Sequence, residues 1–359
     1  MADEHTKDEP VNLFLAEIPT VTWDDIAGQE DAKAQMIEAI ELPFKHKELF
    51  ATYGKQPTKG ILLSGPPGCG KTMLGKAAAN SLSRLHGEGS AKASFFYVKG
   101  PQIVSKWVGT GEKNVRELFD KARQHKAEHG YPAVIFIDEA DSILPDRNND
   151  NTYRTAASIT ASFLTEMDGM QDSAAVIILA TNRPEAIDPA VVREGRIDRK
   201  VVVSRPLMED GIKIVCLNLD RSKVSKGSTS KELAKHAARA IYSPRRVYYT
   251  VDTAAGKMSL TLAHLVNGAM LAAVVDIAIS MAIHRDIKNG GVSGVSRADL
   301  IAAVDAIDRQ NRGLNHGEVI SLFVETLAER PISIKKVPFA QAQKRKKVQE
   351  ADSVEQMAA

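Results

Sequence analysis

Residues 65–72 constrain this chain more than any other stretch. They read Gly-Pro-Pro-Gly-Cys-Gly-Lys-Thr and follow the apolar run Ile-Leu-Leu-Ser. Glycines let consecutive backbone N–H groups point at phosphate oxygens, and the positive end of a following helix attracts the same anion. A Gly/Pro turn between a strand and a helix is the alternative. The full match, in a strand–loop–helix context with an acidic strand end further on, favours a phosphate-binding loop.

We therefore predict that the chain binds a nucleoside triphosphate. Lys71 would supply a point charge for the β- and γ-phosphates, and the Thr72 hydroxyl would bind Mg²⁺. The loop residues expected to contact the nucleotide are Pro67, Gly68, Cys69, Gly70, Lys71, Thr72 and Met73.

A second apolar run ends in two carboxylates, Asp138 and Glu139. Asp138 would hold Mg²⁺ directly or through water, and Glu139 would orient and polarise a water molecule for attack on the γ-phosphate. A strand followed by a charged turn is a common alternative for such a pattern alone. Its pairing with the phosphate-binding loop favours the catalytic interpretation.

Bulk properties bound the remaining possibilities. The 359 residues suffice for two domains, and the net charge of +2 implies neither a nucleic acid nor a membrane surface as partner. Two cysteines fit a reducing compartment, so we expect a cytoplasmic protein. The longest apolar stretch, residues 268–283, contains Asp276 and is predicted to be a core helix. The basic cluster at 344–347 is interpreted as a solvated tail, with contact to acidic partners as the alternative.

Short apolar runs alternate with helical patterns up to about residue 204, which predicts a parallel sheet covered by helices. Residues 1–20 are polar and are predicted to be a flexible lead-in. The expected strands are Gly60–Ser64, Ser94–Val98, Ala133–Ile137, Ala175–Ala180 and Lys200–Val203.

After residue 205 the pattern is mainly helical, and we expect a small helical domain over 205–314. Residues 246–263 are compatible with a β-hairpin insertion. A helix with an apolar stripe is expected to open the segment 315–359, and a basic tail is expected from about Pro331. The predicted helices of the small domain are Gly211–Leu219, Ser230–Ala240, Leu265–Arg285 and Ala298–Arg309, the last with a capping box of Ser296 and Asp299.

The stretch from Val21 to about Arg285 resembles an AAA+ ATPase of the classical AAA clade. Members of that clade include the valosin-containing protein, the N-ethylmaleimide-sensitive factor, proteasomal ATPases, katanin and spastin. The resemblance covers roughly three quarters of the chain, with several motifs in the family's order. It implies an α/β domain with a five-stranded parallel sheet flanked by helices, followed by a small helical lid. It also implies hydrolysis of ATP with Mg²⁺ and assembly into a homo-oligomeric ring, which in this family is a hexamer.

By the same resemblance, Asn182 is sensor 1, an amide that detects the γ-phosphate. A simple turn residue is the alternative, but its position after a buried strand favours the sensor. Arg193 and Arg196 resemble the arginine fingers that enter the neighbouring subunit's ATP site, whereas Arg199 resembles a structural residue. Surface arginines paired with Glu194 or Asp198 are the alternative. The residues that resemble the family's adenine contacts are Asp25, Ile26, Ala27, Gly268 and Ala269.

Lys106, Trp107 and Val108 resemble pore loop 1 of the family, the loop that grips an extended polypeptide in the central channel. The resemblance therefore implies that ATP hydrolysis is coupled to the movement of a polypeptide. A large amphipathic ring can grip a polypeptide of any sequence. A core tryptophan is the alternative, but neighbouring glycines and a lysine disfavour it. A second pore loop is expected near 147–154, with Tyr153 or Arg154 facing the channel. Asp168-Gly169 matches the segment that relays nucleotide state between neighbours.

Two functional classes follow from these patterns. The first is a motor that remodels, unfolds or disassembles protein substrates threaded through a ring. The second is an ATP-driven assembly switch or nucleic-acid-associated motor, for which the basic tail would be the attachment point. No nucleic-acid module is recognised, which favours the first class. No His-Glu-x-x-His motif occurs, which excludes a fused zinc protease. Substrate choice is expected to reside in the termini, an adaptor protein or extra residues at 85–94.

Overall fold

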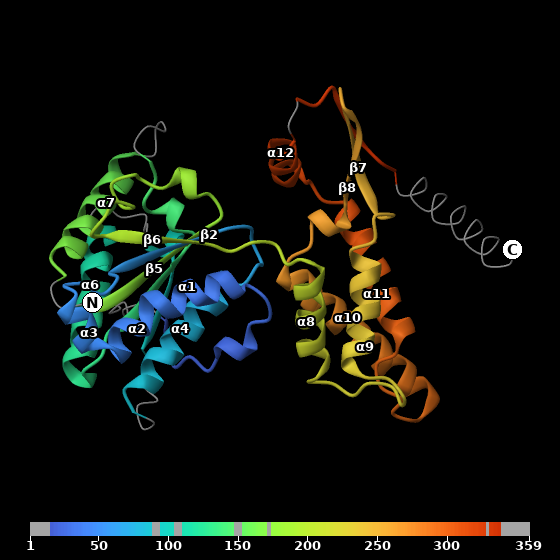
Figure 1. Cartoon of the computed structure of the whole chain (residues 1–359), viewed down its shortest axis with the longest axis horizontal. Coiled ribbons are helices and arrows are strands. Elements are labelled where there is room, and N and C mark those ends of the chain that lie inside the picture. Colours follow the sequence, from blue (N-terminus) through green and yellow to red (C-terminus); the bar gives the residue numbers. More distant parts are fainter. Residues whose placement is uncertain are drawn as a thin grey trace, which may run out of the picture. The chain divides into compact units, whose positions relative to one another are not determined.

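The computed structural model describes residues 15–87, 94–103, 110–146, 153–170, 174–327 and 330–338. The chain divides into two compact units, with the boundary between Ser204 and Arg205. Figure 1 shows both units, with helices and strands labelled where there is room. Each unit is described by itself.

The first unit contains the predicted five-stranded parallel sheet. The strands are ordered β3-β4-β5-β2-β6, and every neighbouring pair among them is parallel. Every residue of β2 and β5 is buried, as expected of central strands covered on both faces. The bounds are β2 (Gly60–Ser64), β3 (Phe95–Lys99), β4 (Ala133–Asp138), β5 (Ala175–Thr181) and β6 (Ile197–Val202).

A sixth strand, β1 (Leu15–Glu17), pairs antiparallel with β3 at the edge of the sheet. The prediction of a flexible lead-in over residues 1–20 is therefore wrong for these three residues. The Glu17 carboxylate also forms an ion pair with Lys76 of the helix α4, at 2.6 Å. Three residues are too few to produce a recognisable alternation of apolar and polar side chains, so this strand left no clear sequence signal.

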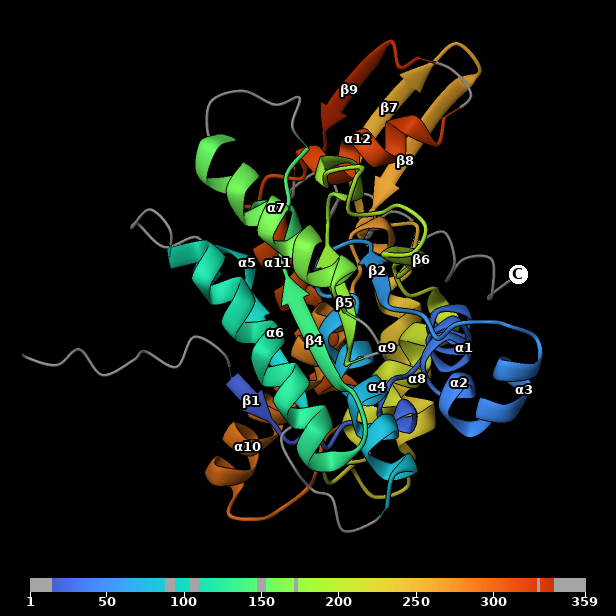
Figure 2. The same ribbon diagram turned by 90° about the vertical axis from the view of Figure 1, so that its left-hand side faces the viewer.

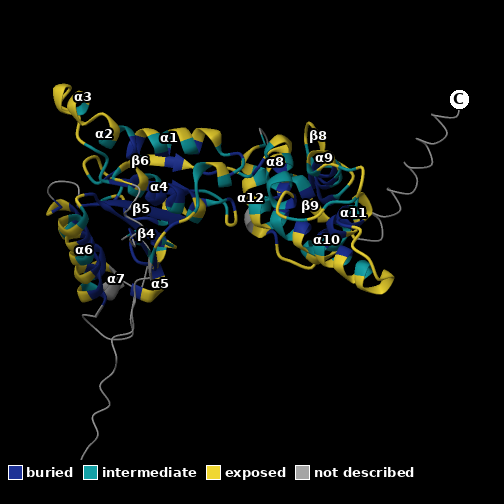
Figure 3. Ribbon diagram, turned by 90° about the horizontal axis from the view of Figure 1, so that it is seen from below, coloured by how far each residue is buried: buried dark blue, intermediate teal, exposed yellow. Residues whose placement is uncertain are grey.

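Helices cover both faces of the sheet. The helices α1 (Glu30–Ile40) and α4 (Lys71–Leu85) lie on one side, and α6 (Thr110–His129) and α7 (Tyr153–Asp168) lie on the other (Figure 2). Figure 3 shows β4 and β5 as buried between helices whose outer surfaces are exposed. Shorter elements complete the unit: the 3-10 helices η1 (Trp23–Asp25), η2 (Ala140–Ser142) and η3 (Pro184–Ala186), and the helices α2 (Leu42–Lys45), α3 (Lys47–Thr52) and α5 (Gly100–Ile103).

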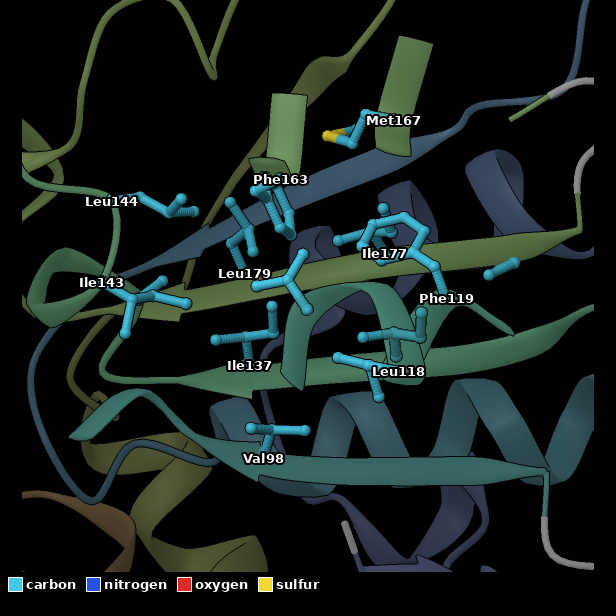
Figure 4. Packing of buried hydrophobic residues seen from close by; sticks show 14 of the residues in the cluster. Val98, Leu118, Phe119, Ile137, Ile143, Leu144, Phe163, Met167, Ile177 and Leu179 are labelled. Carbon is cyan, nitrogen blue, oxygen red and sulfur yellow. The ribbon is translucent and has the colours of Figure 1, made fainter. Parts of the chain in front are cut away.

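Alternating strand residues supply the two cores of this unit. On the side of α6 and α7, Phe119 and Phe163 meet edge to face with ring centroids 5.6 Å apart. Strand residues pack against them, as Figure 4 shows for Val98, Ile137, Ile177 and Leu179. The opposite core contains the intervening strand residues and the buried faces of α1 and α4.

The second unit is built around four helices and confirms the helical pattern predicted after residue 205. The capping box at the start of α11 is present, since the Asp299 N–H donates to Ser296 Oγ and the Ser296 N–H donates to the Asp299 carboxylate. The four helices are α8 (Met208–Leu219), α9 (Ser230–Ile241), α10 (Gly268–Asn289) and α11 (Arg297–Arg312). The 3-10 helix η4 (Leu262–His264) lies just before α10, and α12 (Gly317–Glu325) follows α11.

A three-stranded antiparallel sheet completes the second unit. The strands β7 (Val247–Thr253) and β8 (Gly256–Thr261) form a hairpin, and β9 (Ser333–Lys336) pairs with the other edge of β7. The prediction of a tail from about Pro331 is wrong for β9. This strand is short and largely exposed, so its sequence lacks the apolar pattern of a core element.

One helix in the described part of the chain, α10, is long and apolar enough to cross a membrane by length and composition alone. Its residues Leu271, Val274 and Val275 are buried in the core of the second unit. Core helices of this composition pass the same test, and these contacts agree with the predicted core helix.

Candidate functional site

The phosphate-binding loop joins the buried strand β2 to the first turn of α4. Gly65, Gly68 and Gly70 have φ angles of 146°, 72° and 100°. A Cβ atom at Gly65 would lie 2.0 Å from the carbonyl oxygen of Val203, so no larger residue fits there. Gly70 is the residue that precedes α4, and its left-handed backbone turns the chain into the helix. The sequence therefore folds this segment with the helix N-terminus directly after the loop.

Lys71 connects this loop to the end of strand β5. Its Nζ donates to the carbonyl oxygens of Gly65 at 2.6 Å and Pro66 at 3.0 Å, and to Oδ1 of Asn182 at 2.7 Å. The lysine is only 8% exposed, so its charge is held inside the site rather than in bulk water. The predicted phosphate ligand and the predicted sensor, 111 positions apart, are thus in direct contact.

The position of Asn182 is fixed by the residues around it. Thr181 is buried, and its hydroxyl donates to the Asp141 carboxylate at 2.7 Å while accepting from the backbone N–H of Arg183 at 2.9 Å. These bonds hold the chain on both sides of Asn182. The amide oxygen of Asn182 is therefore presented to Lys71 by a well-anchored turn.

The two predicted carboxylates lie at the end of β4. Asp138 is half-buried, and one of its oxygens accepts the backbone N–H of Glu139 at 3.0 Å. Glu139 is exposed and adopts a left-handed backbone, with φ 52° and ψ 45°. Such a conformation is unfavourable for a residue with a Cβ atom, and residues of this kind cluster at functional sites.

The second Asp138 oxygen accepts the hydroxyl of Tyr97, on the neighbouring strand β3, at 3.1 Å. Burial, together with the charge of Asp138, raises the pKa of Tyr97 to about 12. Sequence reasoning missed Tyr97, because the motif describes only the end of β4. The available signal was the one polar tip in the run Phe-Phe-Tyr-Val, on the strand beside the carboxylates.

The donor set fits a magnesium ion. Thr72 supplies a hydroxyl and Asp138 a carboxylate, which are the oxygen ligands that Mg²⁺ prefers. The described residues contain no group of three or more His, Cys, Asp or Glu side chains able to hold a metal by themselves. Mg²⁺ commonly binds through one or two protein oxygens together with substrate phosphates and water. Two protein ligands beside a phosphate-binding loop match that mode.

The three arginines of the segment 193–199 have different environments. Arg196 donates from Nε and Nη2 to the two carboxylate oxygens of Asp168, at 2.8 and 2.7 Å, and from Nη1 to the carbonyl oxygen of Ala190. Arg199 donates to Glu38 at 2.7 Å. Arg193 is exposed, and no hydrogen bond or ion pair of its side chain is found within the described ranges.

Within the single chain, Arg196 pairs with Asp168 rather than with Glu194 or Asp198, the alternatives suggested by the sequence. Its role as an arginine finger toward a neighbouring subunit stays a prediction. The fold brings the end of α7 to the arginine segment, and Asp168 fills the guanidinium fork. Hydrogen bonds from Arg196 hold the pKa of Asp168 below its ordinary value. Sequence spacing alone treats Arg193 and Arg196 alike, since it carries no information on this pairing.

Comparison with known proteins identifies the first unit. Residues 61–205 match the profile of the ATPase family associated with various cellular activities (AAA). Residues 61–205 therefore match an AAA family domain. The matched segment of this AAA domain begins in β2 and includes Asp138, Glu139, Asn182 and both candidate arginine fingers.

Related proteins from several bacteria carry the name "AAA ATPase forming ring-shaped complexes". Those of Corynebacterium glutamicum (strain R) and Corynebacterium diphtheriae are 37% identical over 86% of this chain, covering 58% and 60% of their own lengths. The protein of Bifidobacterium longum subsp. infantis is 38% identical over 84% of this chain and 61% of its own length. The chain thus spans about three fifths of the length of these relatives.

The predicted adenine contacts all lie outside the matched segment, which covers residues 61–205. The Asp25 carboxylate accepts the N–H and the hydroxyl of Thr22, at 2.9 and 2.8 Å, and Ile26 is buried in the core. Ala27 follows them and is half-buried. Gly268 and Ala269 open α10 in the second unit, so their role remains a prediction.

A buried carboxylate, Glu41, anchors the segment that carries Asp25, Ile26 and Ala27. It accepts Trp23 Nε1 at 2.7 Å and also the Ser81 hydroxyl, and it pairs with Lys45. Burial alone would raise the pKa of Glu41, but these hydrogen bonds lower it below the ordinary value. Sequence reasoning missed Glu41, whose contacts involve residues up to 40 positions away.

The predicted pore-loop residues Lys106, Trp107 and Val108 lie outside the described residues of the AAA domain, as does the part 88–93 of the extra segment predicted at 85–94. Residues 147–152 of the second predicted pore loop lie outside them as well. Tyr153 and Arg154 begin α7, but their side chains are not described.

Proposed function

We propose that this chain is a ring-forming ATPase that couples Mg-ATP hydrolysis to the remodelling, unfolding or disassembly of protein substrates through a central pore. The observation that carries the hydrolytic part is the 2.7 Å contact between Lys71 and Asn182. It joins the ends of β2 and β5, and β4 with its two carboxylates is the next strand. In parallel sheets, ligands bind at this carboxyl edge of the strands.

Each residue of the site has a chemical task in this proposal. The loop N–H groups and Lys71 bind the phosphates, and Thr72 and Asp138 would hold Mg²⁺. When bound, Mg²⁺ neutralises charge on the phosphate oxygens. Glu139 takes a proton from the attacking water, and Asn182 orients that water and detects the γ-phosphate.

Arg193 completes the site from a neighbouring subunit in this proposal. Its exposed guanidinium is available to stabilise charge on the transferring phosphoryl group, an effect that is large when the cation is placed in advance. The relatives' name supports the ring, because those proteins are described as forming ring-shaped complexes. We assign the chain to the classical AAA clade and infer a cytoplasmic homo-hexamer with an adaptor for its substrates and no membrane partner.

An ATP-driven assembly switch or nucleic-acid-associated motor is the alternative, with the basic cluster at 344–347 as the attachment point. The experiment that separates the two measures ATPase stimulation by an unfolded protein and by DNA or RNA, in the natural chain and in Trp107→Ala. Stimulation by the unfolded protein that is lost in Trp107→Ala supports the threading motor. Stimulation by nucleic acid alone, unchanged in Trp107→Ala, supports the alternative.

A further inference from the structure

The carboxylate of Asp138 is oriented by two donors before any ligand enters the site. The Tyr97 hydroxyl donates to Oδ2 at 3.1 Å, and the Glu139 backbone N–H donates to Oδ1 at 3.0 Å. A carboxylate accepts about four hydrogen bonds or metal contacts in total. Both oxygens therefore keep a lone pair for a metal ion or its water, while the plane of the group is fixed.

Tyr97 is itself firmly held. Its ring stacks on Phe136 with centroids 6.0 Å apart and planes 14° apart, and on Phe95 at 6.4 Å. Its backbone lies between two strands, since Leu15 of β1 pairs with Tyr97 on one side and Phe136 of β4 pairs with it on the other. A hydroxyl on such a fixed ring orders a carboxylate at little further cost in conformational entropy.

The hydroxyl is the part of this residue that packing does not explain. The other two rings of the stack, Phe95 and Phe136, are phenylalanines, and a third would keep both ring contacts. The hydroxyl of Tyr97 is directed at the carboxylate instead. Charge-assisted hydrogen bonds of this kind are stronger than neutral ones.

We infer that Tyr97 is a positioning residue for the Mg²⁺-binding carboxylate of Asp138. This inference rests on the proposed function, because it assigns to Asp138 the role of a metal ligand. Tyr97 would not contact the metal or the nucleotide. It would hold Asp138 in the one orientation that suits the strict octahedral geometry of Mg²⁺. Partners that hydrogen-bond a metal ligand typically contribute about 10- to 100-fold in metal affinity or activity.

The test measures how much Mg²⁺ tightens nucleotide binding. In the full chain carrying Glu139→Gln, which prevents turnover, the dissociation constant of a fluorescent ATP analogue is measured with Mg²⁺ and again with EDTA. The ratio of the two constants is the gain due to the metal. Tyr97→Phe should reduce this gain about tenfold and leave binding in EDTA unchanged. Asp138→Ala should reduce the gain at least as much.

A matched control is Tyr131→Phe, which removes a buried hydroxyl that lies 3.4 Å from Ser83 in the same unit. It should leave the gain unchanged. An unchanged gain in Tyr97→Phe would overturn the inference while leaving the proposed function intact. Equal weakening with Mg²⁺ and with EDTA would assign Tyr97 a structural role and overturn it too. No gain in the Glu139→Gln parent would overturn the metal role of Asp138, and the inference with it. Circular dichroism of each variant checks folding, and Mn²⁺ binding followed by electron paramagnetic resonance gives a second measure of metal affinity.

Discussion

Arg196 and Asp168 form a two-bonded ion pair within one chain, although the sequence places both in segments expected to communicate between subunits. Their two hydrogen bonds measure 2.8 and 2.7 Å, and a third bond ties Arg196 to the Ala190 carbonyl. Arg193, three residues earlier, is exposed. The two arginines should therefore respond differently to mutation.

Arg193→Ala should bind ATP normally and hydrolyse it about 10²- to 10³-fold more slowly, because a charge that acts only on the transition state is lost. Steady-state ATPase rates and nucleotide affinities test this. Mixing Arg193→Ala subunits with Glu139→Gln subunits should restore some turnover, since each site takes parts from two chains. No recovery in a demonstrably mixed ring would argue against a finger acting in trans. Arg199→Ala, whose parent side chain binds Glu38, is the matched control.

Arg196→Ala and Asp168→Ala should cause the same loss of ATPase activity, and the double variant should lose no more than either single one. The physical reason is that both substitutions break one contact, so their effects are not additive. The change in stability should be below about 1 kcal/mol, as for other ion pairs at a protein surface. Additive losses of activity would show that the two residues act separately.

Lys71→Ala should lose nucleotide binding, whereas Glu139→Gln should keep binding and block hydrolysis. Lys71 places a buried charge beside the loop, whereas Glu139 is exposed and, in the proposed function, acts on water rather than on the phosphates. Equilibrium binding of a fluorescent ATP analogue and an ATPase assay separate the two. Equal loss of binding in both variants would contradict the assigned roles.

The second unit should lose stability as the pH falls from about 7 to 5. His316 is buried between Tyr248 and Tyr249, and burial, followed by the charge of Lys336 on β9, lowers its pKa from the ordinary 6.5. Below pH 6.5, His316 therefore binds a proton more readily in the unfolded chain than in the folded chain. Its contribution to the free energy of unfolding is complete above pH 6.5 and declines below that value.

Thermal unfolding at pH 7.5 and 5.5 measures this effect. His316→Gln should reduce the difference between the two pH values, and only in part, because burial also lowers the pKa of His264. His46→Gln is the control, since His46 is exposed. An undiminished pH dependence in His316→Gln would exclude His316 as its source.

The sequence predicted the large elements because their residues repeat with a regular period. The buried runs before Asp138 and Asn182 are continuous apolar strands, and the helices of the second unit have apolar stripes over several turns. The strands β1 and β9, of three and four residues, lie at sheet edges. Their pairing depends on partners distant in sequence, so no local pattern revealed them.

The same limit applies to the site. Motifs predicted roles for Lys71 and Asp138, because phosphate and metal chemistry demands those residue types at those positions, and the family resemblance predicted a role for Asn182, which the fold brings into contact with Lys71. They did not locate Tyr97 or the Asp168 partner of Arg196, which come from a neighbouring strand and a distant helix. Such partners are set by strand order and helix packing, and a single sequence read locally does not give either.

The strand β9 determines how the protein would behave if residues 333–336 were removed. It hydrogen-bonds to one edge of β7, whose other edge is covered by β8. Removing residues 333–336 would bare a row of backbone N–H and C=O groups on β7, and uncovered edges of that kind recruit strands from other molecules. A truncated version would therefore be prone to precipitate, and a terminal segment with few apolar residues protects the solubility of the whole molecule.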